Sequence, residues 1–117
     1  MVFDLEIVLR DRDSAIARKC VHAGNDAPGW TELDVQEVLK AMLLAVDQAR
    51  NPAAEERFVA LRGFSWIVEP SDGGVVIAIE IPSGAVVAGP FDIAQSRLDS
   101  LITRVVSAAA PSRPAVH

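Results

Sequence analysis

Apolar and polar residues alternate with a period of two from Arg57 to Ile81, which predicts antiparallel strands. The turn Pro70-Ser-Asp-Gly-Gly74 divides this segment, so that one strand runs up to Glu69 and a second runs from Val75 to Ile81. A four-residue loop between them sets the register. It pairs Val68 with Ile77, Trp66 with Ile79 and Phe64 with Ile81 on the face that we expect to be the core.

A third short strand, 85–88, follows the three-residue turn Pro82-Ser-Gly84. Gly89-Pro90 ends it. The three strands together predict an antiparallel meander. Its second face would carry small and mixed side chains, and we expect it to form an oligomer interface through Ser65, Ile67, Val76, Ala78 and Glu80.

Two segments have the 3.6-residue period of amphipathic helices. The first, 32–50, begins after Thr31, a good N-cap, and ends at Asn51-Pro52, which can also start one further turn to Glu56. The second is predicted to open at Asp92, with Gln95 completing a variant of the capping box, and to run to about residue 109.

The N-terminal segment permits two interpretations. Alternation over 3–9 favours a strand, whereas Leu5, Val8 and Ile16 also share the face of a possible helix starting near Asp4. Asp13-Ser14 can cap a short helix through about His22, and the segment 23–29 predicts a loop.

The fold class is therefore α+β: a three- to four-stranded antiparallel sheet packed against amphipathic helices, in the order β-α-α-β-β-β-α. With 117 residues, the chain fits a single domain, 1–109, followed by a frayed tail, 110–117.

Composition excludes several classes of protein. The net charge is −5, and the eleven basic residues are dispersed among sixteen acidic ones, so no basic stripe is present to bind nucleic acid. The longest uncharged run, 81–91, falls short of the roughly 20 apolar residues of a membrane-spanning helix. Acidic residues near the start argue against a secretory signal, and the single Cys20 fits a reducing cytoplasm. The preference for Arg over Lys and for Ala and Val is typical of a bacterium with a GC-rich genome.

Few residues combine into a site with recognisable chemistry. Cys20 and His22 are possible metal ligands, but the only other histidine is His117, so we expect an ordinary packed cysteine, no metal and no cofactor. The sequence Gly63-Phe64-Ser65 resembles half of a nucleophile elbow, yet Ser65 falls in mid-strand. Glu80 is the one carboxylate within an aliphatic strand, and Arg62 is its possible partner.

The sequence favours a small cytoplasmic protein that binds another protein or forms a homodimer, and it favours this role over catalysis. The element order of residues 31–109 and the acidic charge resemble the small dimeric chaperones of type III secretion, which implies a chaperone or adaptor. The alternative is a small-molecule-binding protein or enzyme, whose pocket between sheet and helices would be lined by Arg62, Ser65, Trp66 and Glu80.

Overall fold

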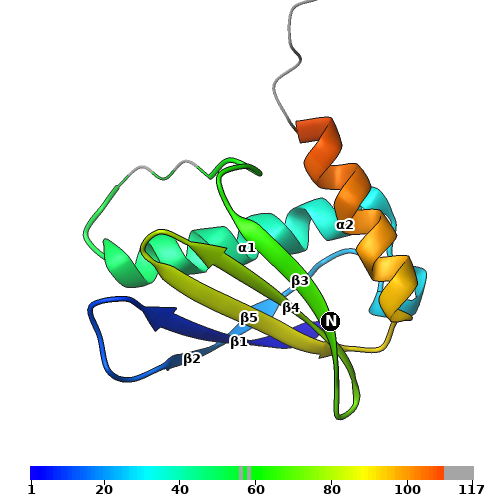
Figure 1. Ribbon diagram of the computed structural model, residues 1–117, viewed down its shortest axis with the longest axis horizontal. Coiled ribbons are helices and arrows are strands. Elements are labelled where there is room, and N and C mark those ends of the chain that lie inside the picture. Colours follow the sequence, from blue (N-terminus) through cyan, green and yellow to red (C-terminus); the bar gives the residue numbers. More distant parts are fainter. Residues whose placement is uncertain (56, 58, 110–117) are drawn as a thin grey trace, which may run out of the picture.

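The computed structural model describes residues 1–55, 57 and 59–109, which form an α+β fold (Figure 1). Five strands and two α-helices follow one another in the order β1 (Val2–Leu9), β2 (Ile16–Val21), α1 (Glu32–Arg50), β3 (Ser65–Ser71), β4 (Gly74–Ile81), β5 (Gly84–Phe91) and α2 (Gln95–Ala109), with one 3₁₀ turn, Ala27–Gly29, before α1. The predicted tail, 110–117, lies outside the described residues.

All five strands belong to one antiparallel sheet, in the spatial order β2-β1-β5-β4-β3. The meander β3-β4-β5 confirms the prediction from the alternating pattern, although Gly89-Pro90 does not end the third strand, which continues to Phe91. Strand β1 confirms the strand interpretation of residues 3–9. The sheet has one strand more than the three or four expected, because β1 pairs with β5 and β2 then pairs with β1.

The predicted register between β3 and β4 is confirmed for Val68 and Trp66, although the loop has two residues, 72–73, instead of four, and Phe64 lies before β3. Val68 pairs with Ile77, Trp66 with Ile79 and Ser65 with Glu80. Val68, Ile77 and Ile79 are buried, and Trp66 is half-buried and packs against the core. The face expected to be the core is therefore the core.

Helix α1 has the boundaries predicted from its caps. Thr31 accepts a hydrogen bond from the backbone of Asp34, and the Asp34 carboxylate bonds back to the backbone N–H of Thr31, which completes a capping box. The buried stripe of α1 comprises Val35, Val38, Leu39, Met42, Leu43, Ala45, Val46 and Ala49.

The helix predicted after Asp13-Ser14 is wrong, since residues 16–21 form strand β2. Asp13 and Ser14 instead lie in the connection between β1 and β2. Ile16 pairs with Ile7 and Cys20 with Phe3. Pairing with β1 satisfies the backbone hydrogen-bonding groups on one side of β2 and covers the edge of the core. These two gains outweigh the local capping signal of Asp13-Ser14.

Two further boundaries differ from the prediction. Residues 57 and 59–64 do not form a strand, although Leu61 is buried and Val59 packs against the core from an irregular segment. Helix α2 begins at Gln95 and not at Asp92, and the Gln95 side chain does not complete a capping box but donates a hydrogen bond to the Val68 carbonyl of β3 (2.9 Å). The further turn predicted after Asn51 is present at residues 52–53, where the Ala54 N–H donates to the Asn51 carbonyl (3.2 Å), and its predicted end, Glu56, lies outside the described residues.

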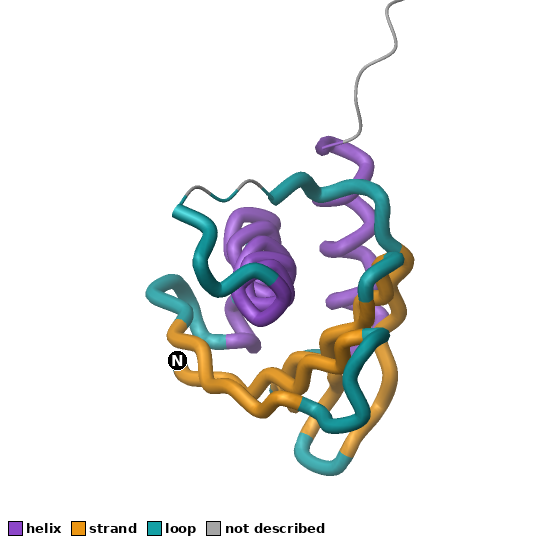
Figure 2. Tube along the Cα trace, turned by 90° about the vertical axis from the view of Figure 1, so that its left-hand side faces the viewer, coloured by secondary structure: helices purple, strands orange, loops and turns teal. Residues whose placement is uncertain are grey.

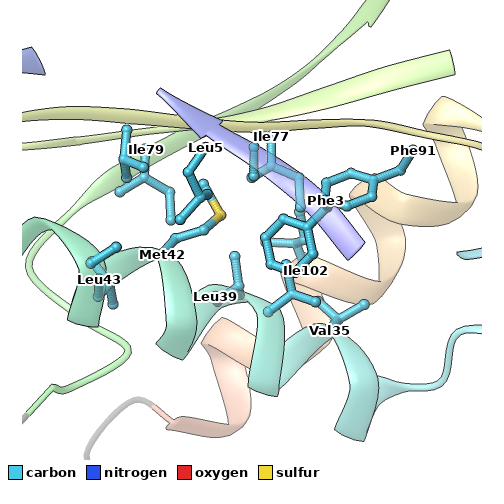
Figure 3. Packing of buried hydrophobic residues seen from close by; sticks show 14 of the residues in the cluster. Phe3, Leu5, Val35, Leu39, Met42, Leu43, Ile77, Ile79, Phe91 and Ile102 are labelled. Carbon is cyan, nitrogen blue, oxygen red and sulfur yellow. The ribbon is translucent and has the colours of Figure 1, made fainter. Parts of the chain in front are cut away.

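Both helices pack on the same face of the sheet, so the structure has two layers (Figure 2). The core between the layers is apolar, with Phe3, Leu5, Ile77 and Ile79 of the sheet against Leu39, Met42 and Leu43 of α1 and Ile102 of α2 (Figure 3). Trp30 is fully buried, with its ring centroid 4.7 Å from that of Phe91. The described part of the chain contains no helix long and apolar enough to span a bilayer.

Candidate functional site

The sheet face opposite the helices, which we call the open face, has no element of the described chain packed over it (Figure 2). Alternate residues of each strand point to it, as the burial patterns of the strands show. Its larger apolar side chains are substantially exposed: Ile67 by 50%, Val8 by 44% and Val87 by 37%. The open face comprises Val2, Asp4, Glu6, Val8, Ala17, Lys19, Val21, Ser65, Ile67, Glu69, Val76, Ala78, Glu80, Ala85, Val87 and Gly89.

The strand registers arrange these side chains in rows that cross the sheet. One row runs Ala17, Glu6, Val87, Ala78 and Ile67, from β2 at one edge to β3 at the other. Its three residues from β5, β4 and β3 form a continuous apolar strip in the middle of the open face.

A neighbouring row runs from Lys19 through Asp4 to Val76 and Glu69. Gly89, which has no side chain, lies between Asp4 and Val76 at a β-bulge of the β4–β5 pairing, and Lys19, Asp4, Gly89 and Val76 line a shallow hollow of about 530 Å³. Lys19 binds Asp4 at 2.8 Å, whereas Glu6, Glu69 and Glu80 form no ion pair within the described residues. The open face is thus apolar at its centre and predominantly acidic around it.

All five predicted interface residues, Ser65, Ile67, Val76, Ala78 and Glu80, lie on this face. Sequence reasoning did not include Val8, Ala85 and Val87, because it could not show that β1 and β5 are neighbours of β4.

The predicted ligand-binding residues Arg62, Ser65, Trp66 and Glu80 come together only in part. Ser65 and Glu80 are cross-strand partners on the open face, while Trp66 points to the helix side. Ser65, Trp66 and Glu80 border a hollow of about 240 Å³. A second hollow, of about 520 Å³, is bordered by Ser65, Glu80 and Arg10, and Arg62 borders neither of the two.

The structure also contains a buried polar cluster that sequence reasoning missed. His22, just after β2, and Asp34, in the first turn of α1, are 4% and 5% exposed. The Nε2 atom of His22 lies 2.9 Å from Oδ1 of Asp34. Trp30 stands edge-on to the imidazole and donates its indole N–H to the carbonyl of Asn25 (2.9 Å).

Asp34 accepts hydrogen bonds on both carboxylate oxygens. Asn25 donates its backbone N–H to Oδ1 (3.1 Å) and its side-chain amide to Oδ2 (2.9 Å), and Thr31 donates both its N–H and its hydroxyl to Oδ2 (3.0 Å each). Burial alone would raise the pKa of Asp34, but the bonds from Thr31, Asn25 and His22 outweigh it and hold the pKa well below its usual range. An ionised carboxylate can only accept hydrogen bonds. In the contact between His22 and Asp34, the Nε2–H of His22 is therefore the donor and Oδ1 of Asp34 the acceptor.

This cluster holds the fold together and offers no reactive group. Both oxygens of Asp34 already have donors, so neither is free to bind a metal ion, and the part of the chain that the structure describes contains no group of three His, Cys, Asp or Glu side chains suited to one. Burial raises the pKa of the half-buried Cys20 thiol, only partly offset by Arg18, so the thiol is a poor nucleophile. His117 lies outside the described residues.

Comparisons with known proteins provide no family for this chain: no family model matches it, and neither the curated proteins nor the solved structures contain a significant match.

Proposed function

We propose that this protein is a non-catalytic module that binds protein through the open face of its sheet. The observation that supports this function is the one-sided packing of the two helices, which leaves Ile67, Val87 and Val8 exposed on one continuous surface. An apolar patch of this kind on a small domain is typical of an interaction site. A chaperone or adaptor that works in the cytoplasm fits this surface and the single half-buried Cys20.

The alternative, a small-molecule site around Arg62, Ser65, Trp66 and Glu80, has weaker support. The hollow that three of these residues border is about 240 Å³, below the roughly 300 Å³ at which ligand pockets begin, and the hollow of about 520 Å³ is bordered by only two of them, Ser65 and Glu80. Arg62 borders neither hollow, and Ser65 and Trp66 point to opposite faces of the sheet. No set of convergent polar groups is available there to orient a substrate.

A capture experiment with two matched variants tests the proposed function. Val87→Glu places a charge in the centre of the open face, and Leu33→Glu places the same charge at a residue of α1 that is 63% exposed and remote from that face. Tagged wild-type protein and both variants are incubated with native lysate, and their molar masses are measured in parallel.

We expect Val87→Glu to lose bound protein, self-associated or foreign, that Leu33→Glu retains. Thermal unfolding of the three proteins checks that they fold equally well. The proposal is wrong if the wild type is monomeric and captures nothing, or if Val87→Glu binds as much as Leu33→Glu.

A further inference from the structure

We infer that the occupant of the open face is a second copy of this chain, stacked face to face with β5 of each copy along the twofold axis. This inference rests on the proposed function and specifies the partner and its orientation. It comes from the position of β5 in the sheet, the size of its side chains and the placement of two opposite charges.

Strand β5 is the central strand, with β1 and β2 on one side and β4 and β3 on the other. Its contributions to the open face are Ala85, Val87 and Gly89, none of which is large. Gly89 has φ +128°, and a Cβ atom there would lie 2.9 Å from the Val75 carbonyl oxygen, so the backbone requires glycine at this position. The centre of the open face therefore allows another sheet to approach to the about 10 Å usual for stacked sheets.

The twofold axis runs parallel to β5, midway between the two sheets. Each strand of one copy therefore faces the strand of the second copy that lies equally far from β5 on the opposite side of its own sheet. Strand β1 then faces β4 of the second copy, and the edge strand β2 faces the other edge strand, β3. With neighbouring strands about 4.8 Å apart, both edge strands lie about 10 Å from the axis. Residues in the same row of the sheet are thereby brought face to face.

The charges at the two edges are complementary in this arrangement. Lys19 of β2 pairs with Asp4, and Glu69 of β3 pairs with Val76, and Asp4 and Val76 both border the hollow over Gly89, where the β4–β5 pairing has a bulge. Stacked sheets cross at about 30°, which displaces the edges by about 5 Å, a distance that these long side chains can span. Two symmetry-related Lys19–Glu69 ion pairs result, one on each side of the axis.

The row Ala17, Glu6, Val87, Ala78 and Ile67 is complementary in side-chain size, except that Glu6 meets Ala78. Val87 lies on the axis and meets its own copy, while Ile67 meets Ala17, so that the largest exposed apolar side chain of the row faces one of the smallest. Alternation of large and small side chains is the usual way in which two sheet faces interlock.

Pairing through the sheet edges is less suited to these residues. At the β3 edge, the Val68 carbonyl is already occupied by Gln95, and Pro70 has no N–H to donate. The β2 edge carries Arg18 and Lys19, and charged side chains on an edge oppose the addition of a like strand. The open face is therefore the better surface for a second copy.

A charge-reversal cycle tests the inference. The dimer dissociation constant is measured by sedimentation equilibrium over a wide concentration range for the wild type, Lys19→Glu, Glu69→Lys and the double variant. Each single reversal brings like charges together twice per dimer, so we expect dimerisation to weaken by about threefold to tenfold. The double variant restores opposite charges, and its dissociation constant should return to within about twofold of wild type.

Lys40→Glu is the matched control, because Lys40 is exposed on α1 and lies away from the open face. It adds the same net charge as Lys19→Glu, so any weakening that it causes measures the general repulsion between the two acidic chains, and we expect that weakening to be smaller than the one caused by Lys19→Glu. Lys19→Glu also loses its own ion pair with Asp4, and unfolding of each variant separates that local effect from dimerisation.

The inference is wrong if the wild type stays monomeric at every concentration, or if the double variant dimerises no better than the single ones. A monomer whose open face captures a different protein would overturn the inference and leave the proposed function standing. A monomer that captures nothing would overturn both.

Discussion

The imidazole of His22 and the carboxylate of Asp34 lie 2.9 Å apart, and this buried contact joins the end of β2 to the start of α1. Met1 and His22 exchange two backbone hydrogen bonds of 2.8 Å, so the same junction also fixes the beginning of β1. The cluster therefore sets how the edge of the sheet meets the helix layer, and it determines the position of β2 on which the open face depends.

Asp34→Ala should destabilise the protein by about 3 kcal/mol. The substitution leaves His22, the Asn25 amide and the Thr31 N–H without their acceptor in a buried site, and unmade hydrogen bonds of this kind are costly. Urea unfolding measures the change. Glu37→Gln is the control: Glu37 is 55% exposed and its carboxylate is 4.0 Å from His22, so its loss should cost less than about 0.5 kcal/mol.

Stability should decrease in acid partly through Asp34. Its folded pKa is lowered relative to the unfolded value of about 3.9, so its contribution is fully present at neutral pH and is lost as the pH falls below about 5 towards the folded pKa. Asp34→Asn cannot titrate at this position. The difference in unfolding free energy between wild type and Asp34→Asn should therefore shrink from pH 7 to pH 3, and a constant difference would contradict the assignment.

Gly24→Ala should destabilise the same cluster, by about 2 kcal/mol. A Cβ atom at residue 24 would overlap Oδ1 of Asp34 and lie 2.7 Å from Nε2 of His22, so the hydrogen bond between them would have to move. Gly29 provides the matched control, since its nearest neighbour to an added Cβ is 3.9 Å away. Gly29→Ala should leave the melting temperature within about 2 °C, and equal effects of both variants would show that the cluster is less tightly packed than described.

Local patterns were sufficient to predict the meander and α1. The Pro70–Gly74 turn and the alternation around it determine the β3–β4 register, because a slip of one residue would turn Trp66 and Ile79 out of the core. Thr31 and Asn51 likewise mark both ends of α1. In each case the decisive contacts are close in sequence.

The polar cluster and β2 depend on contacts between distant parts of the chain. His22 and Asp34 are brought together only when β2 pairs with β1 and the loop through Asn25 folds back onto α1. The spacing of Thr31 and Asp34 indicates a capping box, and that signal could have identified Asp34 as a hydrogen-bonded carboxylate. No local signal identified His22 as the partner of Asp34, because the residues up to His22 are equally compatible with a short helix capped by Asp13-Ser14.

Removing a carboxylate from the open face should tighten the proposed dimer. In the face-to-face arrangement, Glu6 meets Ala78 and Glu80 meets Val8 of the second copy, so each acid loses water without gaining a cation. Glu6→Gln and Glu80→Gln should each strengthen dimerisation by about threefold, measured by sedimentation equilibrium.

Glu55→Gln, at an exposed position outside the sheet, removes the same charge and serves as the control. It corrects for the general repulsion between two chains of net charge −5, which salt also screens over about 10 Å at 0.1 M. An open face that instead binds a basic segment of another protein would show the opposite result, because Glu6 and Glu80 would then attract the partner and both glutamine variants would weaken its binding.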